Sequence, residues 1–333
     1  MDMKQYNGIW VFAEQENAKM NPVTWELLAK ARALGAECGE SVTAVLLGEG
    51  VAQLSTELFA RGADEVIIAE HTALAQYSAR PYQQALTQLA RKYNPSIILY
   101  GATPLGRDLA PRMMVSLNTG LTADAIDLSF DDDGVFCQTT PAYGGKLLAH
   151  IAIPESRPQM VTVRPNTFEP FGPDYSRRGS ALIECVEIEE DNGFEVLETR
   201  PKHSSGVQLD RAKVIVAGGR GVKTERDLEL LHSLADALGG QIACSRPLAE
   251  SGLLSHDYQL GQSGATVKPE LIINAAISGA IQYRVGMQGA KRIASINLNP
   301  SAAIFSISQY GMAADFRSLI PAITEEIARR RQN

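Results

Sequence analysis

The sequence lacks the features of a nucleic-acid-binding or membrane-spanning protein. Its 333 residues carry a formal net charge of −7, whereas a general nucleic-acid binder presents a basic face. No stretch approaches the roughly 18 consecutive apolar residues of a membrane-spanning helix. Residues 1–6 carry both charge signs and no long apolar region follows them, unlike a secretory signal peptide. We therefore expect no membrane span, no nucleic-acid partner and a cytoplasmic location.

Cysteine and histidine are also scarce, and neither forms a recognisable site. The four cysteines form no CxxC pair and lack metal-ligand spacing, so buried thiols in a reducing compartment are expected. None of the five histidines lies in a nucleophile or metal motif. His150 sits in an apolar segment and is expected to be structural, and His256 is typical of a turn. We expect neither a bound metal nor a catalytic residue, which suits a protein whose chemistry belongs to a cofactor.

The first half of the chain alternates strand and helix patterns, which predicts a doubly wound parallel sheet. One helical pattern begins near residue 21, and a second runs over residues 81–93. Short apolar runs predict strands at 8–13, 41–47, 65–69 and 96–100. From about residue 123 to residue 164, turn signals separate short strands such as 135–139 and 149–153. This segment predicts an antiparallel appendage on the first domain.

Residues 187–206 are the predicted boundary between two domains, because an acidic run followed by polar residues favours an exposed connector. The expected domains are residues 1–206, with appendage and linker, and residues 207–333. The second part again alternates, with a helix at 225–238, a final helix at 316–331, and strands at 213–217, 271–276 and 292–296. It predicts a second parallel-sheet domain of flavodoxin or Rossmann-like type.

The loop at residues 101–108 is one candidate ligand site. It follows a predicted strand, and open α/β sheets bind ligands beyond the carboxyl ends of their strands. An ordinary strand-to-helix turn is the favoured alternative, because such turns are common.

Small and polar residues follow four successive strands of the second part, near Gly218, Ser245, Ser278 and Asn297. The turn after the first of these strands is not a GxGxxG fingerprint. Its glycines nevertheless permit close backbone approach, and Arg220 adds a charge-assisted donor. Each motif alone is also compatible with a surface turn. Because parallel strands end along one edge of a sheet, their recurrence predicts a dinucleotide cofactor site.

Several of these segments occur together in the order and spacing of one known family. They are Gly218-Gly219-Arg220-Gly221, Ser245-Arg246, Gly261-Gln262-Ser263-Gly264, Ile277-Ser278-Gly279-Ala280-Ile281-Gln282, Ile296-Asn297, Ala303-Ile304-Phe305, and Tyr310-Gly311 with Asp315. The second half therefore resembles the alpha subunit of electron transfer flavoproteins. Residues 8–14, 119–124 and 157–165 are similar to the same family, so the resemblance covers nearly the whole chain.

The resemblance implies a heterodimer with a beta subunit and one FAD held by the second domain. The flavin would accept electrons from a dehydrogenase, expected to be of acyl-CoA type, or from an NADH-linked beta subunit. Arg246 would lie over the isoalloxazine, where its charge would stabilise the reduced, anionic ring. The implied FAD contacts are Arg220, Ser245, Arg246, Leu260, Gly261, Gln262, Ser263, Ser278, Gly279, Ala280, Ile281, Gln282, Tyr283, Asn297, Asp315 and Phe316.

The sequence departs from the family pattern at two of these positions, Ser263 and Tyr283, and at Ala265, which lies two residues after Ser263. Ser263 replaces a usual threonine, and its hydroxyl is expected to reach the flavin N5 region. Ala265 replaces a usual lysine and removes a charge. Tyr283 replaces a usual histidine; tyrosine can donate a hydrogen bond but brings no positive charge. We therefore expect a less favoured anionic semiquinone than in relatives that carry the histidine.

Three questions of function stay open at this stage. Residues 10–14 and 157–165 look most like anaerobic relatives, some of which hold a second FAD in the beta subunit and bifurcate the electrons of NADH. A nicotinamide-dependent dehydrogenase on Rossmann-like domains is the alternative, although the sequence shows neither its phosphate fingerprint nor its acid–base residue. A pure interaction subunit without cofactor is disfavoured by the retained glycines, Arg246 and Asn297.

Overall fold

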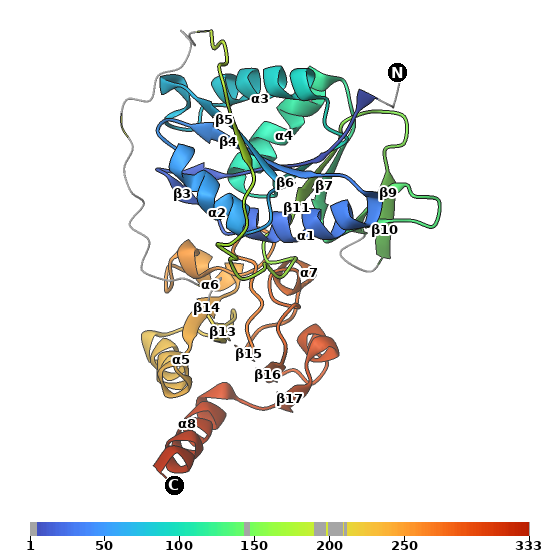
Figure 1. The fold of residues 1–333 in the computed structure, drawn as a ribbon. Coiled ribbons are helices and arrows are strands. Elements are labelled where there is room, and N and C mark those ends of the chain that lie inside the picture. Colours follow the sequence, from blue (N-terminus) through green and yellow to red (C-terminus); the bar gives the residue numbers. More distant parts are fainter. Residues whose placement is uncertain (1–4, 143–146, 190–197, 199–208, 210–211, 333) are drawn as a thin grey trace. The chain divides into compact units, whose positions relative to one another are not determined.

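The chain divides into two compact units, residues 1–198 and 199–333, in a computed structural model (Figure 1). The structure describes residues 5–142, 147–189, 198, 209 and 212–332. The predicted domain boundary between residues 206 and 207 lies outside the described residues.

The first unit is built on a seven-stranded sheet in which every neighbouring pair is parallel. The central strand, β1 (Ile9–Phe12), and its neighbour β4 (Val42–Gly48) are buried along their whole length. Continuous apolar runs of this kind are typical of parallel strands covered on both faces. In spatial order the strands are β12 (Ser180–Glu184), β5 (Glu65–Glu70), β4 (Val42–Gly48), β1 (Ile9–Phe12), β6 (Ile97–Gly101), β11 (Gln159–Val163) and β7 (Leu121–Ala125).

Helices cover both faces of this sheet, as predicted for a doubly wound domain (Figure 1). On one face α1 (Val23–Cys38) and α2 (Ser55–Ala60) contribute Leu27, Leu28 and Leu58 to a hydrophobic core. On the other face α3 (Ala79–Tyr93) and α4 (Pro104–Leu117) contribute Leu86 and Leu109 to a second core. Short elements complete the unit: β2 (Gln15–Glu16), β3 (Lys19–Met20), η2 (Ala52–Leu54) and η3 (Thr72–Leu74).

The predicted antiparallel appendage is a three-stranded sheet of order β10-β9-β8. It contains β8 (Asp127–Phe130), β9 (Phe136–Ala142) and β10 (Leu147–Ala152). The expectation that the whole segment from 123 to 164 belongs to it is wrong, because β11 lies inside the main sheet between β6 and β7. All five residues of β11 are buried, which explains its place in the core.

The loop at residues 101–108 has the geometry of a capped strand-to-helix turn. Thr103 begins α4, and its hydroxyl oxygen accepts a hydrogen bond from the Gly106 amide at 3.0 Å. The same hydroxyl donates to Glu14 Oε2 at 2.5 Å, and Asn21 Nδ2 donates to Glu14 Oε1 at 2.8 Å. Burial raises the pKa of Glu14. The polar groups at this strand end are therefore satisfied by one another, which favours the ordinary turn over a ligand site.

The second unit contains a five-stranded parallel sheet with the strand order of flavodoxin-like folds. In spatial order the strands are β14 (Gln241–Cys244), β13 (Val214–Gly218), β15 (Leu271–Ala275), β16 (Ile293–Asn297) and β17 (Tyr310–Ala313). The order reverses between β13 and β15, so the predicted α/β class and sheet type are confirmed for both units.

Hydrophobic cores lie on both faces of this second sheet. Leu231 of α5 (Glu225–Leu238) and Ile320 of α8 (Phe316–Gln332) pack in one core. Tyr283 of α7 (Ile281–Arg284) and Ile304 of η7 (Ala303–Ile307) pack in the other. The remaining short helices are α6 (Arg246–Glu250) and η6 (His256–Tyr258).

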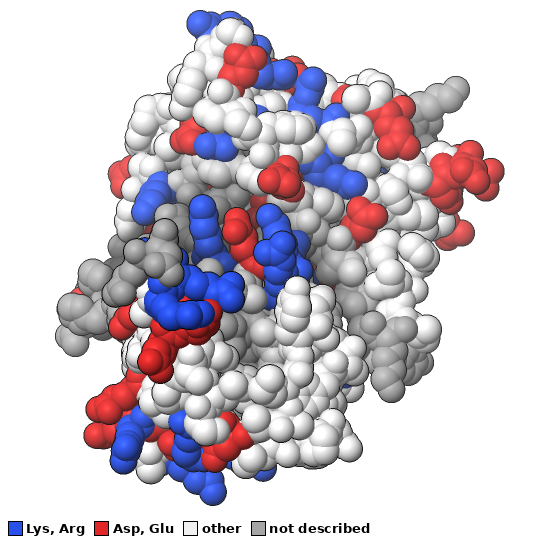
Figure 2. All heavy atoms as spheres, turned by 90° about the horizontal axis from the view of Figure 1, so that it is seen from below, with Lys and Arg blue, Asp and Glu red and all other residues white. Residues whose placement is uncertain are grey.

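The surface drawn in Figure 2 carries charged side chains of both signs. Lys and Arg side chains are interspersed with Asp and Glu on the face shown in Figure 2, and no broad basic surface is seen there. Among the described helices, none is both long enough and apolar enough to cross a membrane.

Candidate functional site

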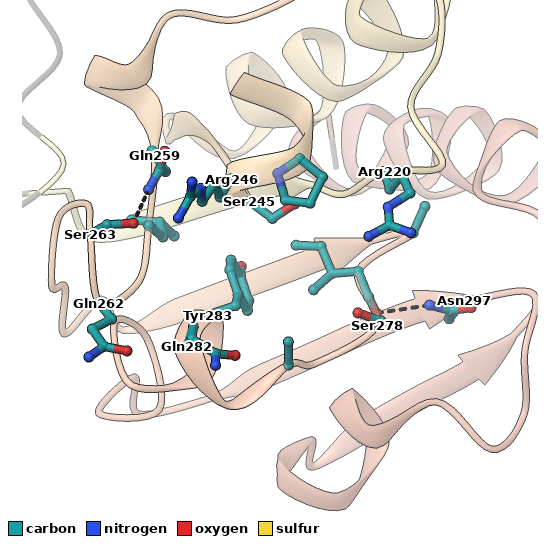
Figure 3. A pocket seen from close by; sticks show the side chains of 15 residues that line it. Arg220, Ser245, Arg246, Gln259, Gln262, Ser263, Ser278, Gln282, Tyr283 and Asn297 are labelled. Carbon is teal, nitrogen blue, oxygen red and sulfur yellow. Dashed lines mark hydrogen bonds between the residues drawn. The ribbon is translucent and has the colours of Figure 1, made fainter. Parts of the chain in front are cut away.

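A cavity of about 690 Å³ opens at the carboxyl edge of the second sheet (Figure 3). Residues that follow β13, β14 and β15 line it, so it lies at the point where the strand order reverses. Open α/β sheets bind their ligands at such a point. The lining residues are Arg220, Ser245, Arg246, Pro247, Gln259, Leu260, Gln262, Ser263, Ala276, Ile277, Ser278, Ala280, Gln282, Tyr283 and Asn297.

Most of the residues predicted to bind the cofactor meet in this cavity. Those in its lining are Arg220, Ser245, Arg246, Leu260, Gln262, Ser263, Ser278, Ala280, Gln282, Tyr283 and Asn297. Gly261, Gly279, Ile281, Asp315 and Phe316 are outside the lining. Gly279 instead borders an adjoining hollow of about 450 Å³, which shares Ser278, Ala280 and Asn297 with the cavity. Phe316 is only 3% exposed and packs in the hydrophobic core.

Two predicted site glycines serve contacts between loops. Gly261 has a φ of +122°, and a Cβ there would lie 2.5 Å from the Gln282 carbonyl oxygen. The neighbouring Gln262 amide donates to that same oxygen at 2.8 Å. At Gly279, with φ of +83°, a Cβ would lie 2.2 Å from the Ile304 amide nitrogen. The family resemblance implies that both glycines contact FAD; in the structure each of them lets two segments of the chain approach each other.

Arg317, which the sequence analysis missed, holds the turn that carries Arg220. Its Nη2 donates to the Gly221 carbonyl at 3.1 Å, and its Nε donates to Asp227 Oδ1 at 2.7 Å. Asp227 also forms a capping box with Thr224 at the start of α5. The hydrogen bond from Arg317 lowers the pKa of Asp227 from 3.8 to about 2. This ion pair fixes the start of α8 against the Arg220 turn.

Arg246, which is expected to bring positive charge to the flavin ring, is paired with a carboxylate. It begins α6 directly after Ser245, and its Nε donates to Glu250 Oε1 at 2.8 Å. The Arg246 side chain is 65% exposed, so solvent screens this pair. Glu250 therefore offsets part of the positive potential that Arg246 brings to the cavity.

Ser263 contacts Gln259, a second residue that the sequence analysis missed. Gln259 Nε2 donates to Ser263 Oγ at 2.8 Å, which Figure 3 shows as a dashed line. On its other side, Gln259 Oε1 lies 2.9 Å from His256 Nδ1. Gln259 follows the short helix η6, and a spacing of four residues separates it from Ser263.

Tyr283 lines the cavity with its ring, but its hydroxyl is turned to a buried partner. The hydroxyl donates to Asn274 Oδ1 at 2.6 Å, and Asn274 Nδ2 donates to Ser295 Oγ at 3.1 Å. Burial raises the pKa of Tyr283 well above its ordinary value, so the phenol stays neutral. This corrects the expectation that Tyr283 has a hydrogen bond to offer a ligand, because its single proton already goes to Asn274.

Asn297 ties the end of β16 to the loop after β15. Its Nδ2 donates to the Ile277 carbonyl at 2.8 Å, and its Oδ1 accepts from the Asn299 amide at 2.9 Å. The side chain thus shapes the wall between the cavity and the adjoining hollow.

The lining fits a large anionic ligand with an aromatic part. Arg220 and Arg246 supply cationic groups, Tyr283 supplies a neutral aromatic wall, and the adjoining hollow extends the site past Asn297. A volume of several hundred Å³ with a few polar groups is typical of cofactor sites. Among the described residues, no group of three or more His, Cys, Asp or Glu side chains could hold a metal ion.

Comparison with known families and proteins agrees with this geometry. The family model named electron transfer flavoprotein domain matches residues 9–191, and the one named electron transfer flavoprotein FAD-binding domain matches residues 208–288. The chain is 42% identical to electron transfer flavoprotein subunit alpha of Thermoanaerobacterium thermosaccharolyticum, over 98% of this chain and 99% of the relative.

Two further relatives carry other names. The chain is 40% identical to protein FixB of Rhizobium meliloti, over 98% of this chain and 94% of that protein. It is 39% identical to subunit LctC of the lactate dehydrogenase (NAD(+),ferredoxin) of Acetobacterium woodii, over 97% of this chain and 77% of that subunit.

Proposed function

This chain belongs to the electron transfer flavoprotein family as an alpha subunit, and on that premise we propose that it holds one FAD in the cavity of the second unit. The observation that carries the proposal is the position of the cavity. It lies at the strand-order reversal of a flavodoxin-like sheet and collects most of the residues that the family resemblance assigns to FAD. When bound, FAD supplies a ring system that accepts and releases electrons.

The chain's own residues would orient the cofactor and adjust its charge. Arg246 and Ser263 would face the ring, and the loop from Ser278 to Gln282 would face the diphosphate, where Arg220 adds a positive charge. Tyr283 would bound the ring with a neutral aromatic surface, since its hydroxyl binds Asn274. The remaining residues that we assign to FAD contact are Ser245, Leu260, Gly261, Gln262, Asn297 and Asp315. Phe316 is left out because its side chain packs in the hydrophobic core.

The first experiment identifies and counts the cofactor. The chain is co-expressed with a beta subunit of the same family, the complex is purified, and the released cofactor is separated by chromatography and quantified. FAD in stoichiometric amount, with a flavin absorption spectrum, supports the proposal. FMN, a nicotinamide nucleotide or a complex without flavin contradicts it.

We also propose a heterodimer with a beta subunit. The name of the Thermoanaerobacterium relative, subunit alpha, itself indicates a multi-subunit protein. Exposed apolar side chains on the edge strand β10 support a protein-binding surface: Leu147 is 59% exposed and Leu148 is 57% exposed. Co-purification tests this directly, with Leu148→Glu expected to weaken the complex. Glu155→Gln, on the exposed turn that follows β10, serves as the control.

We propose two candidate electron donors. An acyl-CoA dehydrogenase is the donor that the resemblance implies, whereas the name of the LctC relative points to a lactate dehydrogenase coupled to NAD(+) and ferredoxin. We also propose flavin-based electron bifurcation in this protein, because residues 10–14 and 157–165 resemble anaerobic relatives. Mixing the purified heterodimer with NADH tests bifurcation: rapid bleaching of the flavin absorption supports it, and an unchanged spectrum contradicts it.

A cytoplasmic location completes the proposal. All four cysteines are unpaired with one another, which suits a reducing compartment. Cell fractionation followed by detection of the chain tests it.

A further inference from the structure

Three side chains form a hydrogen-bonded chain from the protein surface to the cavity. His256 is exposed, Gln259 is only 3% exposed, and Ser263 lines the cavity. The distances are 2.9 Å from His256 Nδ1 to Gln259 Oε1 and 2.8 Å from Gln259 Nε2 to Ser263 Oγ. An exposed imidazole is thus connected, through one buried amide, to a hydroxyl at the proposed flavin site.

The amide of Gln259 gives this chain a direction. Its Oε1 can only accept hydrogen bonds and its Nε2 can only donate them. With the amide placed as it is, His256 presents a protonated Nδ1 to Oε1, and Ser263 Oγ accepts from Nε2. A serine hydroxyl has a single hydrogen, and accepting from Gln259 leaves that hydrogen to be donated elsewhere. Ser263 is consequently a donor toward the cavity.

The backbone around Gln259 holds the amide in place. The Gln259 amide nitrogen donates to the His256 carbonyl at 3.0 Å, and its carbonyl accepts from the Ala265 amide at 2.8 Å. The next residue, Leu260, donates to the Cys244 carbonyl at 2.9 Å. An imidazole and a hydroxyl can each donate or accept, so the group at position 256 can influence which way the buried amide lies. In the structure the amide lies with Nε2 toward Ser263 and Oε1 toward His256.

We propose that Gln259 and His256 are positioning residues that commit the Ser263 hydroxyl to donate a hydrogen bond to the flavin ring. The inference rests on the proposed binding of FAD in this cavity. A donated hydrogen bond stabilises the ring more strongly when reduction adds negative charge to it. Gln259 and His256 thus raise the flavin reduction potential through Ser263, without contacting the flavin themselves.

Position 256 allows the direction of the chain to be inverted without a change of shape. Asparagine, like His256, can present an N–H donor to Gln259 Oε1, whereas an ionised aspartate can only accept. In His256→Asp the Gln259 amide turns to donate to the new carboxylate, its oxygen then accepts from Ser263, and the flavin loses its donor. His256 is exposed, so neither substitution disturbs the core.

The test measures the midpoint potential of the flavin in the purified heterodimer, by reductive titration with a reference dye, together with flavin content. His256→Asp is expected to lower the potential as Ser263→Ala does, by an amount equal to about a two- to tenfold change in the oxidised-to-reduced ratio. His256→Asn should keep the wild-type potential. In the Ser263→Ala background, His256→Asp should have no further effect, because effects transmitted through one group are not additive.

Two results would overturn the inference. One is a wild-type potential in His256→Asp with flavin still bound. The other is an equal effect of His256→Asp with and without Ser263, which would indicate the plain field of a new charge. Gln259→Met gives a second, uncharged interruption of the chain and should lower the potential as well. A heterodimer that holds no flavin in any form, wild type included, would instead contradict the proposed function.

Discussion

The Tyr283 hydroxyl donates to Asn274 Oδ1 at 2.6 Å, and Asn274 has no exposed surface. The cavity wall at this position is therefore a neutral aromatic ring whose polar end is satisfied inside the protein. We predict that Tyr283→Phe lowers the free energy of unfolding by about 1–3 kcal/mol, because it leaves a buried acceptor without its donor. Urea unfolding measures this effect.

The same substitution should leave the flavin potential unchanged, since the lost hydroxyl faces Asn274 and not the cavity. Tyr283→His is the contrasting variant. It introduces a group that can be protonated beside the ring, so the yield of one-electron-reduced flavin in a redox titration should rise. An altered potential in Tyr283→Phe, or an unaltered yield in Tyr283→His, would contradict this account of the wall.

The ion pair of Arg246 with Glu250 predicts a second effect on potential. Glu250→Gln removes the carboxylate that offsets Arg246, so the reduced, anionic flavin should be stabilised and the potential should rise. Both side chains are well exposed, so the effect is small, within about 1 kcal/mol, and should shrink as salt is added. Arg246→Gln should shift the potential in the opposite direction, and shifts of the same sign in both variants would disprove the pairing.

Asp227 predicts a pH dependence of stability in the second unit. Its pKa falls from 3.8 to about 2 on folding, so the carboxylate stabilises the fold fully above pH 4 and loses this contribution as the pH falls toward 2. Asp227→Asn should lower the stability at pH 7 by about 2 kcal/mol and flatten the loss between pH 4 and pH 2. Thermal unfolding across this range measures both effects.

Glu229→Gln, an exposed change on the same helix, is the control for that measurement. It should leave both the stability and its pH dependence close to wild type. If Asp227→Asn retained the wild-type slope between pH 4 and pH 2, another carboxylate would be responsible for it.

The contact between the loops at Gly261 predicts a loss of both stability and cofactor affinity. Gly261→Ala meets an unfavourable φ of +122° and places Cβ 2.5 Å from the Gln282 carbonyl oxygen, so the two loops must separate. Gly252→Ala, at φ of +81° with open space around it, isolates the backbone strain, which costs on the order of 1–3 kcal/mol. We expect weaker FAD binding, measured by fluorescence titration, only in Gly261→Ala. Equal affinities in the two variants would argue against the loop contact.

Elements whose bounds are set by residues close together in the sequence were predicted correctly. The helix α5 was predicted with its observed bounds, because Leu231 and Leu234 mark its buried side and Gly239 ends it. The strand β11 was misplaced, because its position between β6 and β7 is decided by pairing with distant strands. In parallel sheets, neighbouring strands are separated by long crossover connections, so their order is not written in the spacing of residues.

In the functional site, too, some features follow from nearby residues in the sequence and others depend on the fold. Strand ends predicted which residues meet in the cavity, since parallel strands finish at one edge. The partners of those residues were missed where they depend on the fold: Asn274 reaches Tyr283 across a loop, and Arg317 reaches Asp227 from the last helix. The pair of Arg246 and Glu250 was in principle detectable, because residues four apart in a helix are neighbours.

The central claim, that the cavity of the second unit holds FAD, is tested most directly by filling that cavity. Ala280 lines both the cavity and the adjoining hollow, is exposed, and has a φ of −55° that a larger residue can adopt. We predict that the Ala280→Phe heterodimer contains one FAD fewer than the wild-type heterodimer, measured on the released cofactor, while its thermal unfolding remains cooperative. An unchanged FAD content in the folded variant would contradict the assignment.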